Sequence, residues 1–131
     1  MTSSPLLWAL SLWMIATAVG SVVYWVRWFR APHDQEWLPA GYIGHEKALV
    51  YPNAIMSLML VTTAVMTIFE RPNANNVGLV AAGMMGLLAI IDIAYLFEHD
   101  LFRGERGGRV NAAMVLALLA LTCMLIAVPL S

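Results

Sequence analysis

The acidic residue Asp92 lies inside a long apolar stretch of this sequence, which makes it the strongest candidate for chemistry. A carboxylate at membrane depth costs free energy and is usually kept for a function. Such a group can carry a proton, bind a cation or act as a general base. The alternative is a structural carboxylate that hydrogen-bonds to Asn53, Asn111 or a tyrosine, or that reaches interfacial water.

Polar residues recur at helical spacing on several of the apolar stretches. Residues at i, i+3 and i+7 share one face of a helix, which places Asp92, Tyr95 and His99 on a single stripe. Polar groups within a bilayer need partners, so we expect the stripes to face one another and to form a polar pocket. The residues predicted to bind a small molecule or an ion there are Asp92, Asn53, Tyr95, His99, Glu46, Tyr24 and Asn111.

Imidazole and carboxylate groups stand next to each other in His45-Glu46 and in Glu98-His99-Asp100. Both types are ligands of zinc and other divalent metals, so His45 and Glu98 are the candidates for a divalent metal site. The spacing is not diagnostic, because adjacent residues on a helix point about 100° apart. The alternative is an interfacial ion-pair cluster with the nearby basic residues Lys47, Arg103 and Arg106.

The elements that would position these residues follow from composition. Of the 131 residues, 61% are hydrophobic and 11% are charged, against about 45–50% and about 25% in soluble domains. A bilayer-spanning helix needs about 20 apolar residues, and we expect such helices at about 5–28, 48–69, 77–97 and 110–130. The sequence therefore predicts an all-α integral membrane protein, a four-transmembrane-helix bundle that forms a single domain over residues 1–131. The single cysteine, Cys123, is expected to be a small buried side chain.

Charge is distributed unevenly between the two sides of this predicted bundle. Four crossings place the connections at 29–47 and 98–109 on one side of the membrane. On the opposite side the only basic residue is Arg71. The charged side carries most of the basic residues, namely Arg27, Arg30, Lys47, Arg103, Arg106 and Arg109. The positive-inside rule then puts this side and the polar pocket in the cytoplasm, with both termini on the non-cytoplasmic side of the cell membrane. A net charge of −1 gives no indication of nucleic-acid binding.

Pro52 near the start of the second stretch has two interpretations. It either kinks the helix and exposes the carbonyl group of Ala48, or it marks a helix that begins near Tyr51. The third stretch carries small residues at four-residue spacing, namely Gly78, Ala82 and Gly86. Small faces let helices approach closely, either at an oligomer seam or within the monomer's own bundle.

The layout also resembles the MAPEG superfamily, in its long cytoplasmic first loop and its polar residues on the second and third helices. The stretch that carries the resemblance is Glu46-Lys47-Ala48-Leu49-Val50-Tyr51-Pro52-Asn53. The basic residue expected in that family's third helix is missing, and Asp92 is acidic instead. No functional residue is therefore carried over. Small multidrug transporters share the size and the helix number, but they hold their essential carboxylate in the first helix, where this chain has none.

Three functions fit these observations. The first is a small transporter or binding protein that uses the pocket around Asp92 in the lipid bilayer and forms a homo-oligomer, because four short helices enclose little volume alone. The second is a non-catalytic subunit that assembles with partners in a larger membrane complex. The third is a membrane enzyme for a lipophilic substrate, with Asp92, His99 or Glu46 as acid–base groups.

Overall fold

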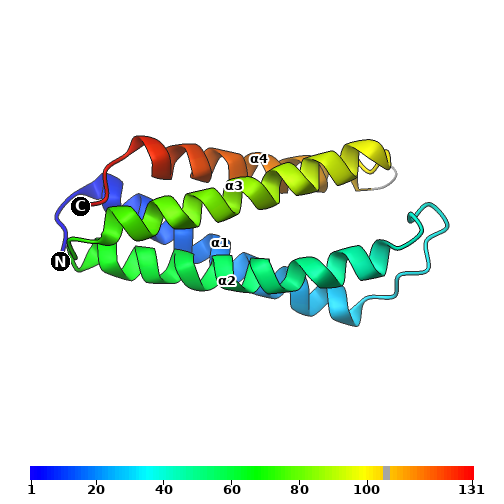
Figure 1. The fold of residues 1–131 in the computed structure, drawn as a ribbon, viewed down its shortest axis with the longest axis horizontal. Helices are drawn as coiled ribbons and strands as arrows, with labels where there is room; N and C mark the ends of the chain where they lie inside the picture. Colours follow the sequence, from blue (N-terminus) through cyan, green and yellow to red (C-terminus); the bar gives the residue numbers. More distant parts are fainter. Residues whose placement is uncertain (105–106) are drawn as a thin grey trace.

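The structure, a computed structural model, describes residues 1–104 and 107–131 and is a bundle of four helices (Figure 1). The helices are α1 (Pro5–Arg30), α2 (Tyr42–Ile68), α3 (Ala74–Glu98) and α4 (Gly108–Ala127). Each is long and apolar enough to cross a membrane. The predicted all-helical fold with four candidate spanning helices is confirmed. Arg106, one of the basic residues used above for the orientation, lies outside the described residues.

The start of α2 differs most from the sequence-based expectation. α2 begins at Tyr42 rather than near residue 48, directly after Gly41, whose φ of 78° is in the left-handed region that favours glycine. Pro52 therefore lies inside α2, and the expectation that the helix begins near Tyr51 is wrong. Because proline has no N–H, the carbonyl group of Ala48 lacks its usual helical donor. The early start adds a turn and a half, and that extra segment carries His45 and Glu46.

The helices pack in chain order, with α1 against α2, α2 against α3 and α3 against α4. Within the described residues, α1 and α4 have no comparable contact, so the first and the last helix do not pack closely against each other. The hairpin formed by α1 and α2 diverges from the hairpin formed by α3 and α4 toward the end that carries the 31–41 loop (Figure 1). This divergence makes room for a cavity at that end.

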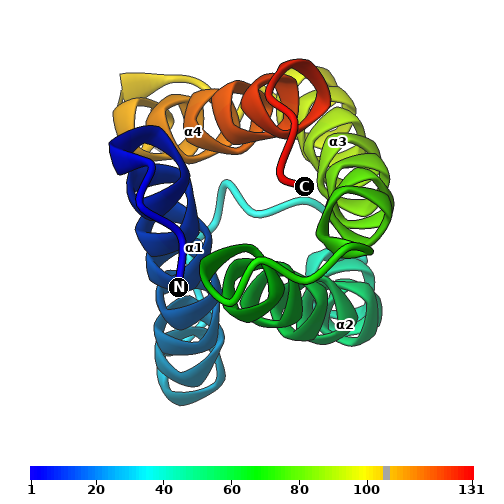
Figure 2. The ribbon, with the colours of Figure 1, turned by 90° about the vertical axis from the view of Figure 1, so that its left-hand side faces the viewer.

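The opposite end of the bundle carries both chain termini (Figure 1). The N–H of Thr2 donates to the carbonyl oxygen of Ile68 at 2.7 Å. The C-terminal tail turns into the middle of the bundle (Figure 2), where Leu130 is only 2% exposed. The N–H of Leu130 donates to the side-chain oxygen of Asn75 at 3.3 Å.

The small residues of α3 are used inside the monomer. A Cβ atom at Gly78 would lie 2.6 Å from Cδ1 of Leu130 and 3.2 Å from Cγ2 of Thr63. A Cβ atom at Gly86 would lie 3.3 Å from Cγ2 of Thr122 on α4, and Ala82 is buried. This face packs against α2, α4 and the C-terminal tail. The small residues therefore allow close packing within the monomer, which was one of the two alternatives, and they are not left free to contact a second copy of the chain.

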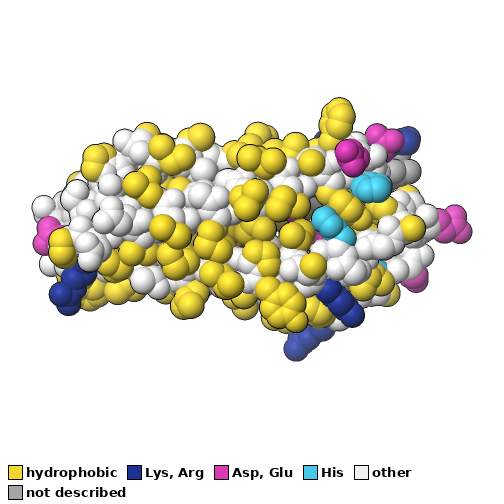
Figure 3. All heavy atoms as spheres, viewed as in Figure 1, with side chains coloured by type: hydrophobic (Ala, Val, Ile, Leu, Met, Phe, Trp, Pro, Cys, Tyr) yellow, Lys and Arg dark blue, Asp and Glu magenta, His cyan; other side chains and the backbone are white. Residues whose placement is uncertain are grey.

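Charged side chains gather at the open end of the bundle. In Figure 3 most basic, acidic and histidine side chains lie over the end that carries the 31–41 loop, and the middle of the visible face is largely apolar. Glu70 and Arg71, in the turn between α2 and α3, belong to the end with the termini, where a carboxylate oxygen of Glu70 lies 4.0 Å from the N-terminal amine. Cys123 on α4 is exposed, so the expectation of a buried thiol is wrong.

Replacing Gly78 with leucine should destabilise the closed end, because the new side chain would overlap Leu130 and Thr63. We expect Gly78→Leu to lower the free energy of unfolding by about 1–3 kcal/mol. The matched control is Gly83→Leu. Gly83 lies on the same helix and is exposed, and a Cβ atom added there would have no neighbouring atom within 4 Å. Thermal unfolding followed by circular dichroism in detergent micelles measures both variants. Equal midpoints for the two variants would contradict the packing described for Gly78.

Candidate functional site

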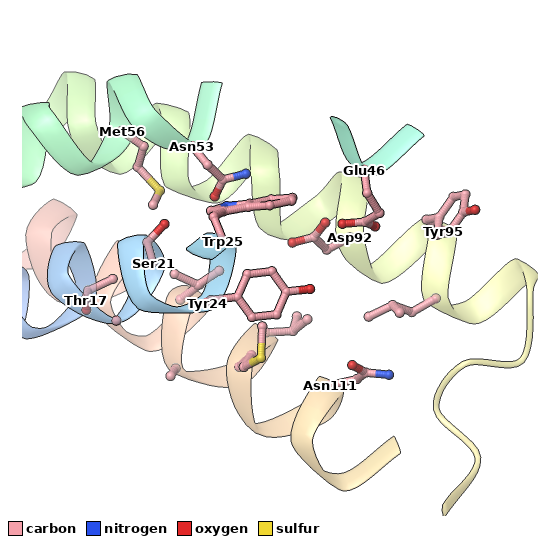
Figure 4. Close-up of a pocket in the computed structure, with 16 residues that line it drawn as sticks. Thr17, Ser21, Tyr24, Trp25, Glu46, Asn53, Met56, Asp92, Tyr95 and Asn111 are labelled. Atoms are coloured by element: carbon pink, nitrogen blue, oxygen red, sulfur yellow. The ribbon is translucent and has the colours of Figure 1, made fainter. Parts of the chain in front are cut away.

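A cavity of about 310 Å³ lies between the four helices, and all four contribute to its wall (Figure 4). Most of its lining comes from the second half of α1 and α3 and the first half of α2 and α4, and Thr17, Met56 and Leu118 near the helix midpoints complete it, which places the cavity toward the open end. Six of the seven residues predicted to form a ligand site line this one cavity, namely Asp92, Asn53, Tyr95, Glu46, Tyr24 and Asn111. The seventh, His99, is exposed at the end of α3, where its ring centroid lies 4.5 Å from that of Tyr95.

Glu46 on α2 and Asp92 on α3 form a pair of carboxyl groups in this cavity. Figure 4 shows the two groups next to each other, with the hydroxyl group of Tyr24 directed toward them. They are close enough to interact electrostatically. In the part of the chain that the structure describes, neither group has an ion pair with a basic side chain. Two like charges in a medium of low dielectric constant repel each other, so a bound cation or a proton would stabilise the pair.

The two asparagines do not act as structural partners of Asp92. The side-chain amide of Asn53 donates to the backbone carbonyl of Leu49 at 2.8 Å. The side-chain amide of Asn111 donates to the backbone carbonyl of Leu101 at 2.7 Å, which ties the end of α3 to the start of α4. Each asparagine thus has its amide nitrogen engaged with backbone, and its amide oxygen is the atom it can offer to a ligand in the cavity.

The ring of Tyr95 contacts two histidine rings at the open end, stacked on His45 and tilted against His99. The ring of His45 lies parallel to that of Tyr95, with centroids 3.8 Å apart and an interplanar angle of 7°. Within the described residues, Nε2 of His45 and the hydroxyl oxygen of Tyr95 are buried without a hydrogen-bond partner. Buried polar atoms of this kind need an explanation, and one explanation is a ligand that the protein binds.

The predicted metal site at His45 and Glu98 has no complete ligand set. Across residues 1–104 and 107–131, no group of three or more His, Cys, Asp or Glu side chains is placed to hold a metal ion. Glu98 is exposed on α3, whereas the ring of His45 packs on Tyr95. The sequence placed these residues on the same side of the bundle, but this proximity does not bring three donors together.

Aromatic contacts at the end of α1 fix where α2 begins and so position Glu46. The indole N–H of Trp28 donates to the hydroxyl oxygen of Tyr42 at 3.1 Å. Nε2 of His33 donates to the backbone carbonyl of Trp28 at 2.8 Å. Tyr42 is the first residue of α2, and Glu46 follows one turn later on the same face. These contacts hold the 31–41 loop against α1 while Glu46 faces the cavity.

Several lining residues were not among the predicted site residues. The wall on α4 consists of Asn111, Met114, Val115, Ala117 and Leu118, most of which share one face with Asn111 at i+3, i+4 and i+7. Extending the stripe that begins at Asn111 would have found them. Gly20 and Trp25 on α1 could have been found in the same way from Ser21 and Tyr24. Met56 on α2 is buried and also borders the cavity.

No family model matches this chain, and neither a curated protein nor a solved structure matches it. The resemblance to the MAPEG superfamily therefore brings no function to the chain. Function is inferred from the fold and the cavity alone.

Removing one charge from the pair of carboxyl groups should stabilise the protein when no ligand is bound in the cavity. We expect Asp92→Asn to raise the free energy of unfolding by about 1–2 kcal/mol, because the repulsion and part of the desolvation penalty disappear while the shape is kept. The control is Asp100→Asn, since Asp100 is exposed and its φ of 55° suits asparagine as well. Thermal unfolding in detergent, with sodium as the sole added cation, measures the change. A lower midpoint for Asp92→Asn would show that Asp92 makes a stabilising contact instead.

Proposed function

We propose that this chain is a small multi-pass membrane protein that binds or transports a small molecule or ion in the cavity between its four helices. Glu46 and Asp92 hold a cation in this proposal. The observation that carries it is the pair of carboxyl groups that share a cavity with no basic partner in the described residues. Such an arrangement costs stability in the empty protein, and a bound cation offsets that cost.

The size and position of the cavity suit a small ligand. Pockets that bind small molecules usually have volumes of about 300–1,000 Å³, and this cavity, at about 310 Å³, is at the lower limit. A cation inside it is attracted more strongly than in water, because the surrounding helices lower the dielectric constant. The closed end, where Thr2 and Leu130 are buried, leaves the open end as the side from which water reaches the site.

The uneven distribution of basic residues supports an orientation in the cell membrane. The open end carries the basic residues of the two loops that flank it, so the positive-inside rule puts that end in the cytoplasm. Both termini and the turn between α2 and α3 then lie on the non-cytoplasmic side. In this orientation the cavity exchanges its ligand with the cytoplasm.

The proposed function is tested by the response of stability to cations. A ligand that binds only the folded state raises stability by about 2.7 kcal/mol at a concentration of 100 times its dissociation constant. We expect at least one of potassium, magnesium, methylammonium or n-hexylammonium to raise the unfolding midpoint of the unmodified protein at constant ionic strength. The increase should disappear in both Asp92→Asn and Glu46→Gln, and Asp100→Asn should keep it.

Two results would contradict this function. One is the absence of any response to all four cations in the unmodified protein. The other is a response that persists in the double variant Glu46→Gln/Asp92→Asn, which would place the cation elsewhere.

The orientation is tested by cysteine labelling in intact cells. In a Cys123→Ser background, we expect a membrane-impermeant maleimide to label Ser131→Cys from outside. Gln35→Cys, in the loop between α1 and α2, should be labelled only after the cells are permeabilised. The reverse pattern would put the open end of the cavity outside the cell, and labelling of both positions in intact cells would show that the chain does not span the membrane as proposed.

A further inference from the structure

The carboxyl groups of the cavity and most of its apolar lining lie at different depths, and the deeper part also contains Thr17, Ser21 and Asn53. The carboxyl groups belong to Glu46 and Asp92, toward the open end. The lining residue Met56 lies ten positions after Glu46 on α2 (56 − 46 = 10), which corresponds to roughly 15 Å along the helix axis. On α4, Leu118 lies seven positions beyond Asn111 (118 − 111 = 7), or roughly 10 Å. An inorganic ion at the carboxyl groups would leave this deeper apolar part unfilled.

The deeper part opens sideways between α1 and α4. These two helices lack the close packing that joins the other neighbouring pairs in the described residues. The lining residues along this gap are partly accessible, with Tyr24 37% exposed and Met114 39% exposed. Gly20 on α1 and Ala117 on α4 also line the cavity and are exposed. Because both helices are apolar enough to span a membrane, an opening at this depth faces acyl chains rather than water.

The side chains around the carboxyl groups suit an organic cation better than a metal ion. Calcium and magnesium ions need six or more oxygen ligands, which the protein or retained water must supply, and no group of three acidic, histidine or cysteine side chains forms in the described residues. Aromatic rings stand beside the carboxyl groups instead. Tyr24 and Trp25 both line the cavity and contact each other edge to face, with centroids 5.2 Å apart. The faces of such rings attract ammonium groups.

We infer that the ligand is an amphipathic ammonium ion, meaning a protonated amine with one apolar group. Its ammonium group lies between Glu46 and Asp92, and its apolar group lies in the deeper part of the cavity, beside the gap between α1 and α4. The gap gives a membrane-dissolved amine access from the lipid. This inference rests on the proposed function, because it names the class of cation that the site takes.

The test uses four probes that differ in charge or in the apolar group, with the unmodified protein in lipid nanodiscs. The probes are n-hexylammonium, methylammonium, n-hexanol and n-hexanoate, and isothermal titration calorimetry measures their dissociation constants. We expect n-hexylammonium to bind at least about tenfold more tightly than methylammonium, since each buried methylene group adds to the affinity. The neutral alcohol and the anionic acid should bind at least about tenfold more weakly than n-hexylammonium, because they lack the charge that the carboxyl groups attract.

Two glycine variants then locate the apolar group. Gly20→Phe fills the gap from the α1 side, and it should remove the preference for n-hexylammonium while methylammonium still binds. The matched control Gly83→Phe also adds a phenyl group at an exposed helical glycine with open space around its Cβ position, but Gly83 does not line the cavity, so it should keep the preference.

The outcomes separate this inference from the proposed function. Equal affinity for the two ammonium ions, or tighter binding of n-hexanol than of n-hexylammonium, overturns the inference of an amphipathic ligand. The proposed cation site still stands if methylammonium or potassium binds the unmodified protein and this binding is lost in Asp92→Asn. A preference that survives in a folded Gly20→Phe variant overturns the position of the apolar group. If Gly20→Phe does not fold, the four probes on the unmodified protein still decide the ligand class.

Discussion

Close packing at one end of the bundle is the constraint on which the open end depends. Gly78 has no side chain, and this leaves room for Leu130 of the C-terminal tail and for Thr63 of α2 at the same place. The tail is anchored there through Asn75, and the N-terminus is anchored through Ile68. Because the two helical hairpins are held together at this end, they can diverge toward the other end and still form one bundle (Figure 1). In the proposed membrane environment this anchor is needed, because lipid chains are as apolar as the helix side chains and do not drive the helices together around a cavity.

Some polar side chains of the bundle form hydrogen bonds with the backbone of their own helix, and others do not. The hydroxyl groups of Thr17, Thr63, Thr67 and Thr122 each donate to the backbone carbonyl four residues earlier, as is common for such residues in helices. Ser57 does the same. An ionised carboxylate has no proton to donate, so it cannot use this local solution. When ionised, Glu46 and Asp92 therefore need a partner from outside their own helix, and no basic residue among those described supplies one.

The sequence predicted the helices and most of the polar and charged side chains that line the cavity, because long apolar stretches indicate the helices and helical spacing indicates their faces. Spacing of three and seven residues from Asp92 indicated the face of the third helix that carries Tyr95 and His99, whereas the face of the fourth helix beyond Asn111 was not followed. The start of α2 was missed because the Pro and Gly residues of the 31–41 connection read as a loop that extends to residue 47. Two side-chain hydrogen bonds, of Trp28 with Tyr42 and of His33 with the backbone of Trp28, stabilise the earlier start. Periodicity carries no information about such contacts. The packing of Gly78 against Leu130 was equally hidden, because the two residues lie in different elements.

The gap between α1 and α4 makes the pair of carboxyl groups, Glu46 and Asp92, accessible from outside the bundle. In a ring of four helices that packs on all sides, two acidic residues facing each other would be sealed from any partner, and selection for stability alone would favour replacing them with apolar side chains of similar volume. Here the first and last helices do not pack closely within the described residues, and cavity-lining residues on both sides of the gap, namely Gly20 and Tyr24 on α1 and Met114 and Ala117 on α4, are exposed. The opening connects the acidic pair to the outside of the bundle without disturbing the closed end. A site that is unfavourable when empty and accessible from its surroundings is what a binding function requires.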